Sequence, residues 1–358
     1  MVIDLDKMTD KVKKEIYKAM WVDGFESDML DGRIDRTYST KYKKKSVNSY
    51  SFVSKGCNAK TLSEIFDIEN EALFCDKYHM AVSGAGNEGT KILTLLSSSL
   101  CALLHFYNVT EKNPLILELT TKNGKVKRTV EFTQSVFEYK SPVINKPSNM
   151  DVVLIGEDKK DNKKIVFFLE SKFSEYYTGI TNSRDKISIE YLNNEYSKEL
   201  YQESVLEQMG LKIADKTGKN FSLKNIEKEK PFYIEGIKQM ISHYTGIRNV
   251  LSGNRCSDWD TDERQHIVDD ALKGDALKGD AVAILGEIIF DERIGKLKNC
   301  KEIYSSKYSA LSKQMSNLIG EGVNLEVLDT ELGYSMFRDY NETHHKIEPN
   351  IRTFYGYT

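Results

Sequence analysis

Cysteine is sparse in this chain. The 358 residues include five cysteines, and no two of them form a Cys-x-x-Cys pair. Structural zinc sites and disulfide frameworks need paired or regularly spaced cysteines, so the sequence argues against both. Isolated thiols are typical of reducing compartments, and we therefore expect a cytoplasmic protein with free cysteines. The five positions are Cys57, Cys75, Cys101, Cys256 and Cys300.

Long apolar runs are also missing. The N-terminal stretch, MVIDLDKMTDKVKKEIYKAMW, lacks the apolar core of a secretion signal. The longest apolar candidate, residues 92–107, is interrupted by Thr94, by the serines at 97–99 and by His105. It is too polar to cross a bilayer, so we expect no membrane partner. A glycine-rich turn at 84–89 precedes it, and we predict that this turn opens one central helix of about five turns.

A strong net charge is the third absence. The formal net charge is −3, which does not by itself favour a nucleic-acid partner. Basic stretches at 41–45, 122–128 and 159–164 could bind phosphate locally, or could be ordinary solvated faces. Hydrophobic residues make up 40% of the chain, which is enough for a large buried core in one or two domains.

A motif at residues 148–172 stands out from the rest of the chain. The stretch SNMDVVLIG is followed by the charged turn EDKKDNKK and then by IVFFLESK. This pattern predicts two antiparallel strands, of which the first begins at Asp151 and the second ends in Glu170-Ser171-Lys172. Because side chains alternate along a strand, Glu170 and Lys172 share a face, and Asp151 would lie at the same end of the sheet. Two carboxylates beside an ammonium group suit a divalent cation and a hydrolytic water.

Acid-x-Lys triplets are common in a chain with 29% charged residues. Others occur at 138–140, 157–159, 158–160 and 161–163, and the last three fall in the polar turn. Glu170-Ser171-Lys172 differs because it follows five consecutive apolar residues. Charges at the end of a buried strand are usually paired or functional, so a structural ion pair is the alternative interpretation.

This arrangement resembles the PD-(D/E)xK nuclease superfamily, which includes many restriction endonucleases and repair nucleases. Asp151, Glu170 and Lys172 match the family motif, although Met150 stands where the family often has proline. The wider stretch from Phe137 to Tyr177 is similar to uncharacterised bacterial proteins described as restriction-endonuclease-like. The resemblance implies an α/β fold with a restriction-endonuclease-like core, in which helices flank a central mixed β-sheet in the order αβββαβ.

The resemblance also implies a chemistry. Asp151 and Glu170, with the backbone carbonyl of Ser171, would hold one Mg²⁺, for which Mn²⁺ could substitute. Lys172 would orient or deprotonate the attacking water, and a phosphodiester bond in DNA would be hydrolysed to leave a 5′-phosphate and a 3′-hydroxyl. Since cutting both strands of a duplex needs two sites, a homodimer is the assembly that this activity suggests.

Two further candidate site residues follow from the resemblance. Glu88 stands near the first turn of the predicted helix before the sheet, where relatives often carry a glutamate; an ordinary first-turn glutamate is an equal alternative. Gln239 lies on the amphipathic helix predicted over 233–251, where several branches place glutamine and, about a turn later, tyrosine. Here His243 is the fourth residue on and Tyr244 the fifth, which leaves the tyrosine role open. A histidine such as His243 is by itself typical of a packed or surface position.

The remaining pattern divides the chain into three parts. We predict a mainly helical N-terminal extension over residues 1–75 and a nuclease-like core over 76–330, with an insertion at about 173–230. Residues 331–358 are expected to form a C-terminal tail that packs on the core. Strands are predicted at 114–120, 126–139, 281–291 and 323–328, and a helix at 302–318. Asn123-Gly124 predicts a hairpin turn between the first two strands.

Two other functions compete with a nuclease. The fold could serve as a non-catalytic DNA- or protein-binding module that keeps the site for structural reasons. A P-loop-like NTPase is the other, because Gly84–Lys91 approximates G-x-x-x-x-G-K-[ST], with Thr90 and Lys91 in reversed order. The shifted lysine would point about 100° away from the phosphates around the helix.

Overall fold

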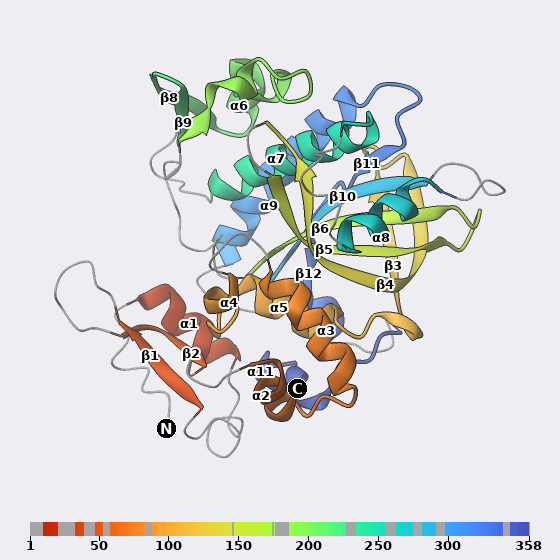
Figure 1. The fold of residues 1–358 in the computed structure, drawn as a ribbon. Coiled ribbons are helices and arrows are strands. Elements are labelled where there is room, and N and C mark those ends of the chain that lie inside the picture. The colour runs from red at the N-terminus through yellow and green to blue at the C-terminus, as the bar shows by residue number, and fades with distance from the viewer. Residues whose placement is uncertain are drawn as a thin grey trace.

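The centre of the fold is a mixed β-sheet with helices on both faces (Figure 1). This agrees with the α/β class and the helix-flanked mixed sheet predicted from the sequence. The structure is a computed structural model, and it describes residues 10–20, 33–38, 47–52, 58–83, 88–144, 147–173, 175, 186–226, 234–254, 263–274, 281–290, 298–338 and 344–357. In these ranges no helix is both long and apolar enough to cross a bilayer.

One half of the sheet is an antiparallel meander. Its strands are β3 (Thr110–Thr121), β4 (Val126–Pro142), β5 (Pro147–Asp158) and β6 (Lys164–Lys172). The predicted turn at Asn123-Gly124 is confirmed, with φ of +80° at Gly124. The β5–β6 hairpin is also confirmed, but β5 begins at Pro147 and not at Asp151. The earlier residues are extended because β5 keeps pairing with β4 as far as Pro142 opposite Pro147.

The other half of the sheet is parallel. Helices α7 (Ile234–Leu251) and α8 (Glu263–Leu272) lead from β6 to β10 (Val282–Ile289), which runs parallel to β6. Helix α9 (Lys298–Leu318) then leads to β11 (Leu325–Val327), parallel to β10. A short strand that the sequence did not predict, β12 (Leu332–Gly333), extends the β10 edge. Every residue of β10 is buried, as expected for a strand whose sheet is covered on both faces.

Helices α7 and α9 cover one face of the sheet, and α8 covers the other (Figure 1). The predicted apolar stripe of α7, comprising Ile234, Ile237, Ile241 and Tyr244, is buried. Helix α7 approaches β4 very closely at Gly246, where an added Cβ would lie 2.2 Å from Ser141 Oγ. A glycine is therefore required there, and its absence of a side chain places the helix directly over the strands.

The single five-turn helix predicted after the glycine turn is wrong. The structure has a short α4 (Glu88–Lys91), then two successive turns over 92–97, then α5 (Ser98–Phe106). These turns form an isolated bridge with β2 (Val47–Phe52) at Thr94: the Phe52 amide donates to the Leu93 carbonyl at 2.8 Å, and the Leu95 amide to the Tyr50 carbonyl at 3.1 Å. Ser97 then caps α5. An apolar run can thus be buried without being helical throughout, which its composition alone did not reveal.

The N-terminal part is less helical than predicted. It contains α1 (Lys11–Met20), α2 (Ala59–Phe66) and α3 (Glu71–Val82), but also a β-hairpin of β2 with β1 (Ile34–Tyr38). The basic stretch at 41–45 lies outside the described residues. The alternation of buried Tyr50 and Phe52 along β2 shows why these residues form a strand against the core.

The insertion after β6 forms its own small sheet. Strands β7 (Ile187–Ser188), β9 (Asn220–Asn225) and β8 (Leu211–Thr217) pair in that order, with α6 (Glu203–Gln208) beside them (Figure 1). Part of its tyrosine content packs on α7: Tyr191 and Ser242 share a hydrogen bond, and the Arg248 guanidinium lies over the Tyr196 ring. Tyr176 and Tyr177 lie outside the described residues.

The C-terminal segment packs against α5. After α11 (Pro349–Phe354), Tyr355 and Tyr357 are buried. His105 of α5 accepts or donates a hydrogen bond with the Tyr357 hydroxyl at 3.0 Å and is surrounded by aromatic rings. Burial lowers the pKa of His105 to about 3, so this histidine is neutral and part of the core.

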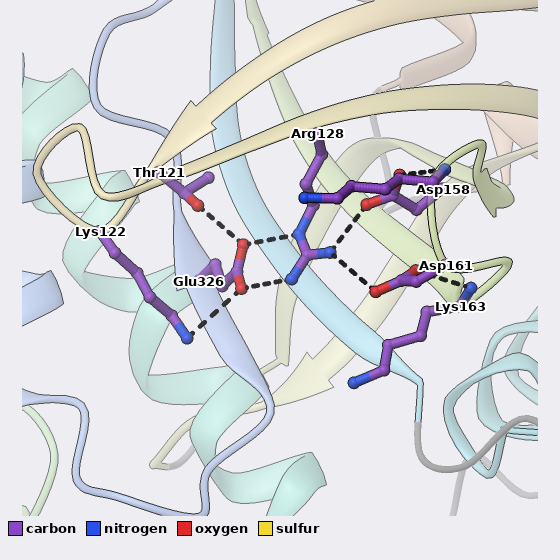
Figure 2. A network of polar contacts seen from close by, with 8 residues as sticks. Thr121, Lys122, Arg128, Asp158, Asp161, Lys163 and Glu326 are labelled. Carbon is purple, nitrogen blue, oxygen red and sulfur yellow. Dashed lines mark hydrogen bonds and ion pairs between the residues drawn. The ribbon is translucent and has the colours of Figure 1, made fainter.

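The two edges of the central sheet meet at one end. Thr121 at the end of β3 forms a bridge with Leu328, which follows β11. Arg128 of β4 joins the same region by hydrogen bonds to Glu326 of β11 and to Asp158 at the end of β5 (Figure 2). These contacts close the sheet at the end away from Asp151.

Candidate active site

Strand register brings Asp151 and Glu170 together. Val152 of β5 is paired with Leu169 of β6, so Asp151 and Glu170 come next in the ladder and share a face. Asp151 Oδ2 accepts a hydrogen bond from the backbone amide of Ser171 at 2.8 Å. In an antiparallel ladder the N–H and C=O of one residue point to the same neighbour, so the Ser171 carbonyl also faces β5. The proximity predicted from the sequence is present.

Glu170 and Lys172 form a buried ion pair. They lie two residues apart on β6, and Lys172 Nζ is 2.5 Å from Glu170 Oε1. Each residue is only 3% exposed. Taking two charges out of water is costly, and their attraction offsets that cost only when the geometry is good and neighbouring groups make further polar contacts.

Helix α7 supplies a further contact through His243. Its Nε2 lies 2.9 Å from Glu170 Oε2, and its Nδ1 lies 2.7 Å from the Ser148 hydroxyl on β5. The Nε2 atom is at ion-pair distance from the carboxylate, but it is not aligned as a hydrogen bond. The hydrogen bond with Ser148 fixes the orientation of the His243 ring. This ring and Lys172 flank the Glu170 carboxylate, so the contacts connect β5, β6 and α7.

The two carboxylates have opposite electrostatic environments. Burial alone would raise the pKa of Glu170, but Lys172 and His243 outweigh burial and lower its pKa to about 2. For Asp151, loss of hydration and the nearby charge of Glu170 raise the pKa well above its usual range, although Lys172 opposes this. Glu170 is therefore held ionised, whereas the surroundings of Asp151 would be improved by a cation.

A polar cavity of about 450 Å³ opens beside these residues. Its lining includes Asp151, Glu170 and Lys172 from the sheet, Gln239 from α7, and the start of α5 at residues 97–99. Ser171 ties α5 to β6, because its hydroxyl donates to the Ser98 carbonyl at 3.1 Å. The volume lies within the range of ligand-binding pockets.

Three oxygen atoms at this site lack a hydrogen-bond donor among the described residues. They are Glu170 Oε2, Gln239 Oε1 and Asn149 Oδ1, and all three residues line the cavity. A buried acceptor without a partner costs about 1–3 kcal/mol. Carboxylate and amide oxygens are the ligands that hard cations prefer, so the donor set fits a cation such as Mg²⁺.

The fit involves more than side-chain carboxylates. In the part of the chain that the structure describes, no three Asp, Glu, His or Cys side chains are grouped closely enough to enclose a metal ion by themselves. Asp151, Glu170 and the Ser171 carbonyl would hold Mg²⁺ together with water and substrate oxygens. This composition is usual for Mg²⁺, which keeps several waters in most protein sites.

The structure also places residues at the site that the sequence analysis did not select. Glu138 lines the cavity from β4, although its Glu138-Tyr139-Lys140 triplet looked like one of several ordinary ones. Glu175, just past β6, lines it as well and accepts a hydrogen bond from the Phe173 amide. His243 contacts Glu170 directly. The one sequence signal for His243 was its spacing from Gln239 by four residues, one turn along α7.

Another carboxylate lies next to Glu170, on the neighbouring strand β10. Glu287 of β10 is in register with Glu170 and fully buried, and the Tyr304 hydroxyl of α9 donates to its carboxylate at 2.8–2.9 Å. Burial raises the pKa of Glu287 to about 8, with Lys172 and Tyr304 acting in the opposite direction. Glu287 therefore carries a proton at neutral pH, and it adds little negative charge to the site.

The remaining candidates have different outcomes. Gln239 is at the cavity, as expected. Glu88 begins α4, but its side chain lies outside the described part of the structure. The P-loop interpretation receives no support from the fold: a P-loop connects a strand to a helix, whereas the glycine turn here directly follows helix α3. Residues 84–87 themselves lie outside the described ranges.

Comparisons of the chain with protein-family models, with curated proteins and with solved structures gave no significant match. The interpretation of the site therefore depends on the motif and on the geometry given above.

Proposed function

We propose that this protein is a metal-dependent phosphodiester hydrolase that acts on DNA, similar to restriction endonucleases. The observation that carries the proposal is the convergence of Asp151, Glu170 and Lys172 from two neighbouring strands at one polar cavity. The choice of DNA as substrate comes from the resemblance to the PD-(D/E)xK superfamily. A homodimer, which would supply two sites for the two strands of a duplex, is part of the same proposal.

The order of elements supports the proposal at the level of the fold. Helix α5 precedes the antiparallel strands β4, β5 and β6, and α7 leads to β10, which is parallel to β6. This order is compatible with the αβββαβ order that the resemblance implies when β3 is counted as an added strand, residues 173–230 as an insertion and α8 as an added helix. The motif residues lie on the second and third antiparallel strands of this series.

Each residue has a distinct role in the proposed chemistry. Asp151, Glu170 and the Ser171 carbonyl would hold the cation, which when bound would polarise a phosphate oxygen and lower the pKa of a bound water. Lys172 orients the attacking water and offsets negative charge that grows on the phosphate. His243, fixed by Ser148, keeps the Glu170 carboxylate in place, and Gln239 offers an amide oxygen to the cavity.

A second candidate is a non-catalytic DNA- or protein-binding module. The observation in its favour is that Lys172 and His243 already flank the Glu170 carboxylate, which is almost fully buried. A closed ion pair of this kind could persist as a structural element of the sheet. A catalytic role and a purely structural role of the Glu170–Lys172 pair predict different cleavage activities for variants in which one charged side chain is replaced by an uncharged one of similar shape.

A cleavage assay separates the two candidates. The protein would be incubated with supercoiled, linear and single-stranded DNA, with and without Mg²⁺ or Mn²⁺, beside Glu170→Gln and Lys172→Met. Matched controls are Glu157→Gln and Lys163→Ala, which replace exposed charges at the far end of the same hairpin. We expect metal-dependent cleavage that falls at least about 100-fold in both site variants and is unchanged in both controls. If folded wild-type protein cleaves none of these substrates, the nuclease proposal fails and the binding module is favoured.

A further inference from the structure

Glu138 occupies a position opposite Asp151 in the sheet. Phe137 pairs with Val152 and Tyr139 with Met150, so Glu138 and Asp151 are the residues between these two pairs. Glu138 is 5% exposed and lines the cavity that Asp151 and Glu170 line. Its negative charge helps to raise the pKa of Asp151. Three carboxylates on three consecutive strands therefore adjoin one cavity.

Glu138 is held there at an energetic cost. Its φ is +54°, a left-handed conformation in the middle of a β-strand that costs a residue with a Cβ on the order of 1–3 kcal/mol. Like charges directly opposite each other in a sheet are also unfavourable. Glu131 of the same strand is a suitable comparison, because its carboxylate pairs with Lys159 Nζ at 2.8 Å and it is not among the residues that line the cavity.

A separate observation indicates which kind of ligand would relieve this cost. Glu170, more than nine-tenths buried, has one carboxylate oxygen without a hydrogen-bond donor in the described part of the chain, and the amide oxygens of Gln239 and Asn149 share this condition. All of these groups are acceptors, and all belong to residues lining the same cavity. An anion or a neutral acceptor would not satisfy them, whereas a hydrated cation satisfies them with its charge and with its water protons.

We propose that Glu138 is a third carboxylate of the divalent-cation site, acting on the waters bound to the ion. Asp151 and Glu170 are the direct ligands, as in the proposed function on which this inference rests. The carboxylates are not grouped closely enough for all three to touch one ion, so Glu138 accepts hydrogen bonds from metal-bound water. It thereby holds in place the water layer from which the attacking water comes, as a positioning residue. In this proposal the additional acidic residue of the site is Glu138 on β4, whereas the resemblance to the nuclease superfamily suggested Glu88.

The test measures metal binding and does not depend on activity. MnCl₂ would be titrated into the full-length protein in a calorimeter, for wild type, Glu138→Gln, Asp151→Asn and the control Glu131→Gln. We expect Glu138→Gln to weaken Mn²⁺ binding about 10- to 100-fold, which is the range found when an outer-sphere partner of a metal site is removed. Asp151→Asn should weaken it at least as much, and Glu131→Gln should bind like wild type.

The outcomes separate this inference from the proposed function. If wild type binds Mn²⁺, Asp151→Asn loses binding and Glu138→Gln binds like wild type, the inference about Glu138 is refuted while the nuclease site stands. If wild type binds no Mn²⁺, both are refuted. Thermal unfolding in the presence of a chelator checks the fold: Glu138→Gln should show one cooperative transition, as wild type does. If Glu138→Gln does not fold, Glu138→Asp replaces it, and unchanged Mn²⁺ affinity in that shortened side chain would refute the inference.

Discussion

Replacing Arg128 by methionine tests how the central sheet is closed. The guanidinium of Arg128 donates from Nε to Glu326 Oε2 at 3.0 Å, from one terminal nitrogen to Glu326 Oε1 at 2.8 Å, and from the other to Asp158 Oδ2 at 2.9 Å (Figure 2). Arg128 is therefore bidentate on Glu326 and joins β4, β5 and β11. Methionine keeps most of the side-chain volume and removes all three hydrogen bonds.

The magnitude follows from what the substitution leaves behind. The side chains of Glu326 and Asp158 are only 2% and 3% exposed, and that of Arg128 is 12% exposed, so solvent screens the three charges weakly. Removing one partner of a buried ion pair costs about 3–5 kcal/mol. Glu326 keeps two other contacts, a hydrogen bond from the Thr121 hydroxyl at 2.7 Å and the half-exposed Lys122 ammonium at 3.4 Å. We therefore expect a loss toward the lower end, about 3–4 kcal/mol.

Urea unfolding followed by circular dichroism measures this loss as a lower midpoint at an unchanged slope. Lys127→Met, an exposed lysine on the same strand, is the matched control and should stay within about 0.5 kcal/mol of wild type. Adding Glu326→Gln to Arg128→Met should cost less than the sum of the two single changes, because the stranded carboxylate is then gone. A loss below about 1 kcal/mol in Arg128→Met, or strict additivity in the double variant, would contradict the reasoning.

Two further predictions concern the neighbours of Glu170. Since burial raises the pKa of Glu287 to about 8, the folded protein binds this proton more tightly than the unfolded chain does; the resulting stability is fully present below about pH 4.5 and is lost as the pH rises through 8. Glu287→Gln still offers an acceptor to Tyr304 and should remove this pH-dependent loss of stability, which is on the order of 5 kcal/mol. The urea midpoint of each protein would be measured across this pH range. If the two pH profiles are parallel, the Glu287 carboxyl is not protonated. For His243, alanine should lower the DNA cleavage rate about 10- to 100-fold, because the contact with the Glu170 carboxylate is lost. Glutamine, whose amide keeps a polar group beside that carboxylate, should retain more activity than alanine. Equal rates in wild type and His243→Ala would show that the histidine is only packed.

The sequence by itself determined the β5–β6 hairpin, helix α7, strand β10 and one part of the site. The apolar run 165–169 ending in Glu170-Ser171-Lys172, with a charged turn before it, could form little else than a buried strand of a hairpin. The spacing of Asp151 from that turn placed its carboxylate near Glu170, because pairing across a short connection leaves few registers. The apolar stripe of α7 and the mostly apolar run of β10 were predicted because the pattern of apolar residues records which side chains are buried.

Contacts between distant segments were decided by the tertiary structure. Glu138 looked like an ordinary charged residue until the β4–β5 register placed it opposite Asp151. His243 could be assigned to a helix face but not to Glu170, because the approach of α7 depends on Gly246 fitting against Ser141, more than a hundred positions earlier. The turns before α5 were mistaken for helix because the strand that they contact, β2, lies about 40 positions upstream. Local periodicity records burial, whereas the register between strands and the depth at which a helix packs are set by side chains that meet only in the folded chain.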